Sequence, residues 1–107
     1  MRTLKFIVDK QMLKKDPSCD FGGLVKGTKG YLKAQFVFSK EWDNCIKVAG
    51  FFSSTEEYEP QKLDERGFCN IPDEALKKQS FNIRVYGKRD GFYIQTNRLN
   101  IVQDGGI

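Results

Sequence analysis

The chain has 107 residues, of which 39% are hydrophobic, and its 18 basic and 14 acidic side chains give a formal net charge of +4. This length and composition are those of one globular domain and exclude an intrinsically disordered chain. No window approaches the roughly 18 apolar residues of a membrane span, and no charged leader precedes an apolar stretch. We therefore expect a single soluble domain over residues 1–107 that has no membrane partner.

The first half of the chain alternates apolar and polar residues with a period of two, which predicts β-strands. Residues 3–8 and 31–38 follow this pattern. In the second of these segments one parity is apolar and is expected to face the core, namely Leu32, Ala34, Phe36 and Phe38.

Residues 46–52 form a further predicted strand, and this one is apolar on both parities. We expect one parity to face the core, namely Ile46, Val48, Gly50 and Phe52. Ala49 and Phe51 on the opposite parity indicate that the other face of the strand is partly covered as well.

Residues 55–69 carry a weak signal and are interpreted either as a pair of short polar strands or as a loop. After them, Pro72 stands at a first-turn position, with Asp73 next to it and Lys77 at the far end. This order of charges suits the helix dipole. It predicts one short connecting helix.

The last part of the chain predicts a hairpin. Residues 81–86 alternate again, the cluster GKRDG at 87–91 supplies a turn, and residues 92–96 return antiparallel. A Thr-Asn step at 96–97 interrupts the alternation, which resumes at 99–101. Short strands at this spacing predict an all-β fold, an antiparallel β-sandwich or barrel with one short connecting helix.

The chain contains three cysteines and no histidine. Without an imidazole, neither a Ser-His-Asp or Cys-His mechanism nor a histidine metal site can be assembled. Cys19, Cys45 and Cys69 are far apart in the sequence, so they form no C-x-x-C pair, and their odd number makes no closed disulfide framework. We expect a protein that is not an enzyme and holds no metal or cofactor, with Cys69 as a small buried residue.

Several lysines alternate with apolar residues in the predicted strands, as Lys5 and Lys33 do. Side chains at such positions form the solvated face of a half-buried strand. A nucleic-acid-binding protein instead gathers its basic residues on one face, with aromatic residues between them. The pattern favours a charged surface without a nucleic-acid partner.

The loop at 16–30 is rich in glycine. Gly22 and Gly27 have the spacing of a phosphate-binding loop, but Thr28 precedes Lys29, which reverses the order of that motif. A surface loop that binds no ligand is the favoured interpretation.

Acidic residues cluster between positions 56 and 65, namely Glu56, Glu57, Glu59, Asp64 and Glu65. Paired carboxylates can hydrolyse glycosides or bind calcium, yet the spacing of a calcium-binding loop is missing here. A solvated polar edge that discourages aggregation between strands is the favoured interpretation.

Four stretches together resemble a known family: FIVDKQMLKK at 6–15, YLKAQFVFSKEWDNCIKVAGFF at 31–52, CNIPDEAL at 69–76 and FNIRVYGKRDGFYIQTNRLNIVQDGG at 81–106. They are similar to the small immunoglobulin-like β-sandwich module of virion structural proteins from phages of Gram-positive bacteria. The most specific pieces are the aromatic strand that ends in Phe-Ser before EW, the Ile-Pro helical turn, the strand that ends in Tyr-Gly and the Thr-Asn step. They are core and turn positions, so they identify a module better than its docking site.

The resemblance implies an antiparallel immunoglobulin-like β-sandwich with a structural or docking role on a virion, made in the cytoplasm of the host bacterium. Longer members of the family continue into further domains, whereas this sequence stops after QDGGI. We therefore expect a capsid decoration subunit that binds the major capsid protein and self-associates on the particle. The near variant is a small tail or baseplate component. The alternative from another class is a phage-encoded inhibitor that binds a host or defence protein.

The predicted contact residues of this partner interface are two exposed strand tyrosines and a basic loop, namely Tyr86, Tyr93, Lys26 and Lys29. The tyrosines, like Tyr31, have outward parity in their strands. Trp42 is assigned to the core instead, because a tryptophan between two strands of a sandwich more often fills one end of the core than anchors a partner.

Overall fold

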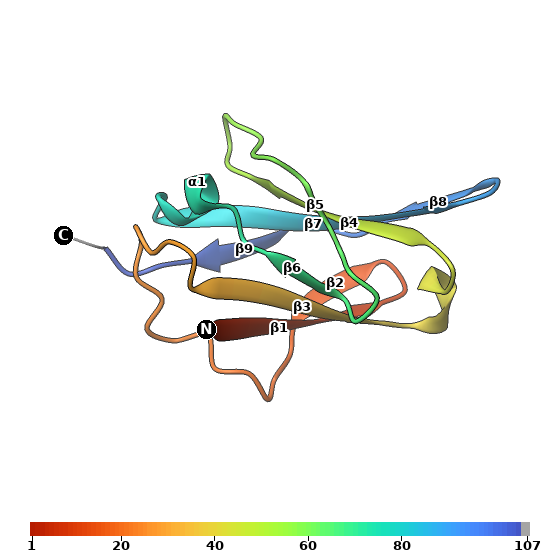
Figure 1. The fold of residues 1–107 in the computed structure, drawn as a ribbon, viewed down its shortest axis with the longest axis horizontal. Coiled ribbons are helices and arrows are strands. Elements are labelled where there is room, and N and C mark those ends of the chain that lie inside the picture. The colour runs from red at the N-terminus through yellow and green to blue at the C-terminus, as the bar shows by residue number, and fades with distance from the viewer. Residues whose placement is uncertain (106–107) are drawn as a thin grey trace.

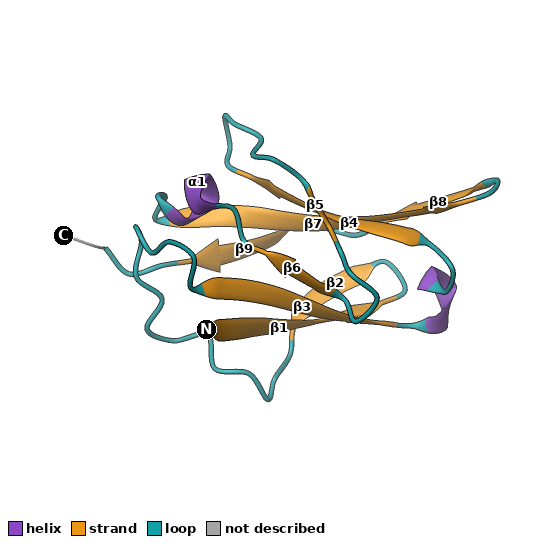
Figure 2. Ribbon diagram, viewed as in Figure 1, coloured by secondary structure: helices purple, strands orange, loops and turns teal. Residues whose placement is uncertain are grey.

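The computed structural model describes residues 1–105 and contains nine strands. The strands are β1 (Arg2–Asp9), β2 (Met12–Lys15), β3 (Leu32–Phe38), β4 (Ile46–Phe52), β5 (Gln61–Lys62), β6 (Phe68–Asn70), β7 (Ser80–Arg89), β8 (Phe92–Gln95) and β9 (Leu99–Val102). Two helical turns, η1 (Lys40–Trp42) and α1 (Asp73–Leu76), connect them. The strands form two sheets that lie one above the other (Figures 1 and 2). The predicted β-rich fold and the helical turn after Pro72 are confirmed.

The first sheet has the order β2-β1-β3-β6 and is mixed, which corrects the expectation of a purely antiparallel sandwich. β1 and β3 run parallel, with Arg2 opposite Leu32 and Val8 opposite Phe38, whereas β2 and β6 pair antiparallel at the two sides. Parallel neighbours require a long crossover between them. The connection at 16–31 supplies that length. The alternation within each strand does not indicate whether neighbouring strands run parallel or antiparallel.

The second sheet has the order β5-β4-β7-β8, and β9 pairs with β7 beyond the end of β8. The chain leaves this ladder at the Thr-Asn step. The Thr96 hydroxyl accepts the Val85 N–H at 3.0 Å, and the Asn97 Oδ1 atom accepts the Leu13 N–H of the opposite sheet at 2.6 Å. The predicted interruption is thus a bend that ties one flank of the two sheets together.

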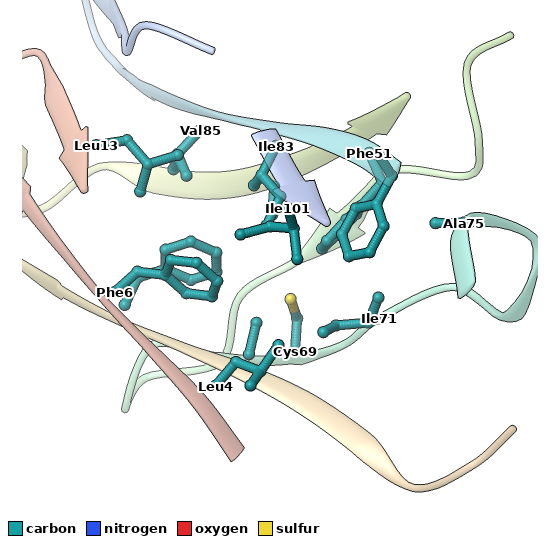
Figure 3. Close-up of a cluster of buried hydrophobic side chains, with 14 of the residues drawn as sticks. Leu4, Phe6, Leu13, Phe51, Cys69, Ile71, Ala75, Ile83, Val85 and Ile101 are labelled. Atoms are coloured by element: carbon teal, nitrogen blue, oxygen red, sulfur yellow. The ribbon is translucent and has the colours of Figure 1, made fainter. Parts of the chain in front are cut away.

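The core lies between the sheets and takes side chains from both (Figure 3). Leu4 and Phe6 of β1 meet Ile83 of β7 and Ile101 of β9 across this space, and all four are at most 1% exposed. The inward parity predicted for residues 31–38 and 81–86 is confirmed by the buried side chains of Leu32, Ala34, Phe36, Phe81, Ile83 and Val85. Burying each large side chain stabilises the fold by about 1.5–3 kcal/mol.

The parity predicted for β4 is wrong. Ile46, Val48, Gly50 and Phe52 lie on the outer face of the sheet. Ala49 and Phe51 are buried instead, because they lie opposite Val85 and Ile83, and directly opposed residues of an antiparallel pair share a face. When both parities of a strand are apolar, its partner strand decides which one is inside.

The turn predicted at 87–91 is shorter in the structure. Arg89 pairs with Phe92, so that Asp90 and Gly91 alone connect β7 to β8. Gly87 remains in β7, where a Cβ atom would stand 2.6 Å from Cε3 of Trp42. This glycine therefore permits the close approach of an indole ring and does not form a turn.

Trp42 closes one end of the sandwich and is fully buried. Its ring lies 5.1 Å from that of Phe38, and its Nε1–H donates a hydrogen bond of 2.7 Å to the Lys10 carbonyl. The assignment of this tryptophan to the core is confirmed.

Candidate functional site

The outer face of the five-stranded sheet is hollowed beside the chain that connects β4 to β5. The volume of this hollow is about 380 Å³. Its lining residues are Val48, Gly50, Phe51, Phe52, Glu57, Tyr58, Pro60, Tyr86 and Tyr93, and we call it the tyrosine hollow. Strands β4, β7 and β8 form its floor, and the connection at 53–60, which rises above the sheet in Figure 1, forms its wall.

The structure brings Tyr86 and Tyr93 together on the face that their parity predicted. Their rings are stacked with centroids 6.5 Å apart, and Tyr93 is 60% exposed. Tyr86 is half-buried because its ring lies over Gly50, where a Cβ atom would stand 3.0 Å from Cε2 of the ring. A glycine on β4 thus leaves room for an aromatic ring from the neighbouring strand.

The wall of the hollow was missed by sequence reasoning. The Tyr58 N–H donates to the Phe51 carbonyl at 2.9 Å, and an isolated bridge joins Glu57 to Phe52. Tyr58 is 9% exposed, and its buried hydroxyl has no hydrogen-bond partner among residues 1–105. The one available signal was Tyr58, an aromatic residue within the acidic stretch. It indicates a site only after the fold has placed it beside β4.

Lys26 and Lys29 do not share a face with the tyrosines. The Lys26 N–H donates to the Asp104 carbonyl at 3.1 Å, and the Gly27 N–H donates to the Leu76 carbonyl of α1 at 2.7 Å. This loop and α1 lie at the end of the molecule opposite to β8 (Figure 1). The predicted contact residues therefore form two separate surfaces.

The acidic cluster around β5 is solvent-exposed, as a polar edge requires. Asp64 has a local structural role, because its carboxylate accepts the N–H groups of Arg66 and Phe68 at 2.8 and 2.9 Å. The hydrogen bond from Phe68 is the main cause that lowers the pKa of Asp64. Within residues 1–105, no three Asp, Glu or Cys side chains lie close enough together to hold a metal ion.

Three lysines, each in a different strand, share the outer face of the first sheet. Lys5 and Lys33 come together because Thr3 lies opposite Lys33 in the parallel pair, and Lys14 lies beside Ile7. The exposed or half-exposed positions predicted for Lys5 and Lys33 are confirmed. The alternation within one strand could not predict that these lysines share a face, because that depends on how the strands pair.

The cysteines differ in burial. Cys69 is 8% exposed and faces the core from β6, whereas Cys19 and Cys45 are half-exposed. Desolvation, with a smaller contribution from the Asp64 charge, raises the pKa of the Cys69 thiol to about 12. Because the thiolate is the nucleophile, we expect Cys69 to be unreactive in the folded protein at neutral pH.

Alkylation of the folded protein with iodoacetamide at about pH 8 is expected to modify Cys19 and Cys45 and to leave Cys69 free. Peptide mass mapping checks this result, and the same reaction in denaturant is the control in which Cys69 reacts as well. Equal labelling of Cys69 and Cys45 in the folded protein would contradict the burial of the β6 thiol.

Comparison with known proteins does not assign the chain to a family: no family model and no curated protein matches it. Of the two helical segments in residues 1–105, neither has the length and apolarity needed to cross a membrane.

Proposed function

We propose that this protein is a non-enzymatic structural component of a bacteriophage virion, with an immunoglobulin-like sandwich, and that it decorates the capsid surface. Two features support the proposal. Four stretches between residues 6 and 106 resemble virion sandwich modules, and those stretches supply most of the strand residues of a two-sheet fold. The protein is made in the cytoplasm of the host bacterium and is carried on the virion, with the major capsid protein as its partner.

The main structural support for a docking role is the tyrosine hollow. Tyrosine combines an apolar ring with a polar hydroxyl and is enriched in protein interfaces. Here two stacked tyrosines lie beside Val48 and Phe52, while the exposed Glu57 adds a carboxylate at the wall. We assign this hollow as the surface that meets the capsid shell.

The loop that carries Lys26 and Lys29 lies apart from the stacked tyrosines. The molecule is 47 Å long, and this loop lies at the other end from β8. A decoration subunit binds a repeated lattice, so several modest contacts hold it by avidity. The basic loop is therefore available to a neighbouring subunit.

Particles of the phage that encodes this sequence are expected to carry the protein in a copy number comparable to that of the major capsid protein. Quantitative gel densitometry of gradient-purified particles measures this ratio. A faint band that fractionates with isolated tails would move the protein to the tail or baseplate. Absence from particles, together with abundant expression in infected cells, would contradict both structural roles and leave the inhibitor.

A matched pair of variants tests the docking surface. Tyr86→Ser removes one ring from the tyrosine hollow and is expected to lower co-sedimentation with capsids lacking the protein by about tenfold or more. Tyr31→Ser removes a tyrosine that is 49% exposed, immediately before β3, and should leave co-sedimentation unchanged. Thermal melts of both variants establish that the folded state persists. Equal capsid binding by the two variants would exclude the hollow as the contact.

A further inference from the structure

The hairpin of β7 and β8 ends in an edge strand that lacks the usual protection. β8 has the sequence FYIQ, with no charged residue and no proline. Three other edges are charged or very short: β2 carries Lys14 and Lys15, β5 has two residues and β6 has three, whereas β9, with the sequence LNIV, is uncharged like β8. Natural edge strands are commonly blocked in these ways, because an open edge is a template for another strand.

Further along the same side of β7, the chain is occupied on both sides of β9. The Gln95 carbonyl accepts a hydrogen bond from the Gln11 side chain at 3.2 Å, and the Asn97 N–H donates to the Gln11 carbonyl at 3.2 Å. Beyond β9, the Asp104 N–H donates to the Leu24 carbonyl at 2.6 Å. On the hairpin that extends past the body of the sandwich, the open part of the edge is the backbone of Tyr93 (Figure 1).

The backbone groups of Tyr93 point away from β7. Thr96 exchanges hydrogen bonds with Val85, and the groups that face a partner strand alternate along an antiparallel ladder. Residues 92 and 94 share the parity of Thr96 and face β7, so the Tyr93 N–H and C=O face outward. Neither group has another hydrogen-bond partner among residues 1–105.

We propose that this edge pairs with β8 of a second copy of the chain, antiparallel about a two-fold axis, and joins the two five-stranded sheets into one. The inference does not depend on the proposed function. Antiparallel pairing of identical strands is self-complementary, as a two-fold interface requires. The Tyr93 backbone groups point away from β7 within the plane of the sheet, and the Tyr93 side chain lies on the solvent face of the sheet. When the two β8 strands pair at this residue, both Tyr93 rings therefore meet on the solvent face. They extend the stack of Tyr86 on Tyr93 by a cross-strand aromatic pair.

Charge does not oppose this pairing. β8 is neutral. The Arg89 guanidinium lies over the Phe92 ring and donates to the carbonyls of Glu41 and Asp43 of its own copy. On the strands next to the joined pair, the Lys88 residues of the two copies lie opposite Tyr93. Three strand spacings separate them by about 14 Å, beyond the Debye length of about 8 Å at physiological ionic strength. A ladder this short buries less than a standard interface, so the dissociation constant is expected to lie above about 1 µM.

The joined sheet has a consequence for recognition. A two-fold axis perpendicular to the sheet places both tyrosine hollows on the same side of the dimer. Two copies then present paired sites to one repeated surface, which raises the strength of attachment without any new contact.

Sedimentation equilibrium of the purified protein, from about 1 µM to about 1 mM, tests the proposal. The weight-average mass is expected to rise from 12.3 kDa toward twice that value. Tyr93→Pro removes the outward N–H while the hydrogen bonds of residues 92 and 94 to β7 remain, and Tyr93→Lys places like charges across the two-fold axis. Both variants should keep the monomer mass throughout, and circular dichroism melts verify that they fold.

Tyr93→Ala is the matched control, because it removes the ring and keeps the N–H. It should still dimerise, with a larger dissociation constant.

Amide hydrogen exchange gives a direct readout, since exchange at Tyr93 should slow as the protein concentration rises. A wild-type protein that stays monomeric at the highest concentration would overturn the proposal. So would Tyr93→Pro and Tyr93→Lys variants that fold and dimerise like the wild type. Neither result concerns the presence of the protein on virions, which the particle densitometry measures separately.

Discussion

Replacing Trp42 with alanine is expected to lower the free energy of unfolding by about 3–5 kcal/mol. The indole is fully buried, lies 5.1 Å from the Phe38 ring and covers Gly87. Its removal opens a cavity and leaves the Lys10 carbonyl without its 2.7 Å donor. Domains of this size have a total stability of about 5–15 kcal/mol, so the variant loses a large fraction of it. Urea denaturation measures the loss, and the thermal midpoint should fall by well over 10 °C, at about 4–8 °C for each kcal/mol.

Trp42→Phe separates the two contributions. Phenylalanine keeps an aromatic ring beside Phe38 and removes only the indole N–H and part of the volume, so its effect should be smaller, about 1–3 kcal/mol. A Trp42→Ala variant that loses less than about 1 kcal/mol would show that this end of the sandwich is not part of the cooperative core.

Replacing Gly67 with alanine is expected to lower the free energy of unfolding by about 2–5 kcal/mol, from two causes that add. The backbone of Gly67 has a φ of +81°, which L-residues with a side chain rarely adopt. A Cβ atom would also stand 2.3 Å from the Phe36 carbonyl oxygen of β3. Since the Phe36 N–H donates to the Gly67 carbonyl at 2.9 Å, the clash cannot be relieved without moving a core strand. Chemical denaturation of the variant and the parent measures this difference.

Gly91→Ala is the control that measures the cost of the positive φ angle alone, without a steric clash. Gly91 has a φ of +67° in the turn between β7 and β8, and a Cβ atom there would meet nothing within 4 Å. Its replacement should cost about 1–2 kcal/mol, the usual cost of the left-handed conformation. Equal losses for Gly67→Ala and Gly91→Ala would contradict the predicted collision with β3.

The strands themselves were predictable because alternation is a local property. Whether a side chain points to one face or the other depends on its position in the strand, so residues 31–38 and 81–86 showed their buried side without any partner. The helical turn after Pro72 was predictable for a similar reason, since a proline and the charges behind it act within a few residues.

The candidate site was predictable only in part. The outward parity of Tyr86 and Tyr93 placed both tyrosines on one surface. Tyr58 joins them because the connection at 53–60 folds back over β4, where the Tyr58 N–H donates to the Phe51 carbonyl, and no alternation or turn motif in the sequence indicated this return. Lys26 and Lys29 looked suitable as partners of the tyrosines on charge alone, yet the loop that carries them is bonded to α1 and Asp104 at the far end of the molecule.

Local patterns predicted the strands at 3–8, 31–38, 46–52 and 81–96 and the core positions of Trp42 and Cys69, whereas they left 55–69 open and made the turn at 87–91 too long. Tertiary structure alone decided the parallel direction of β3 beside β1, the buried parity of β4, the role of Gly87 beneath the indole and the assembly of the tyrosine hollow. Alternation and turn chemistry act between near neighbours in the chain. Strand direction, sheet register and close approach are set by contacts between residues far apart in sequence, and their energies become defined only when both partners are in place.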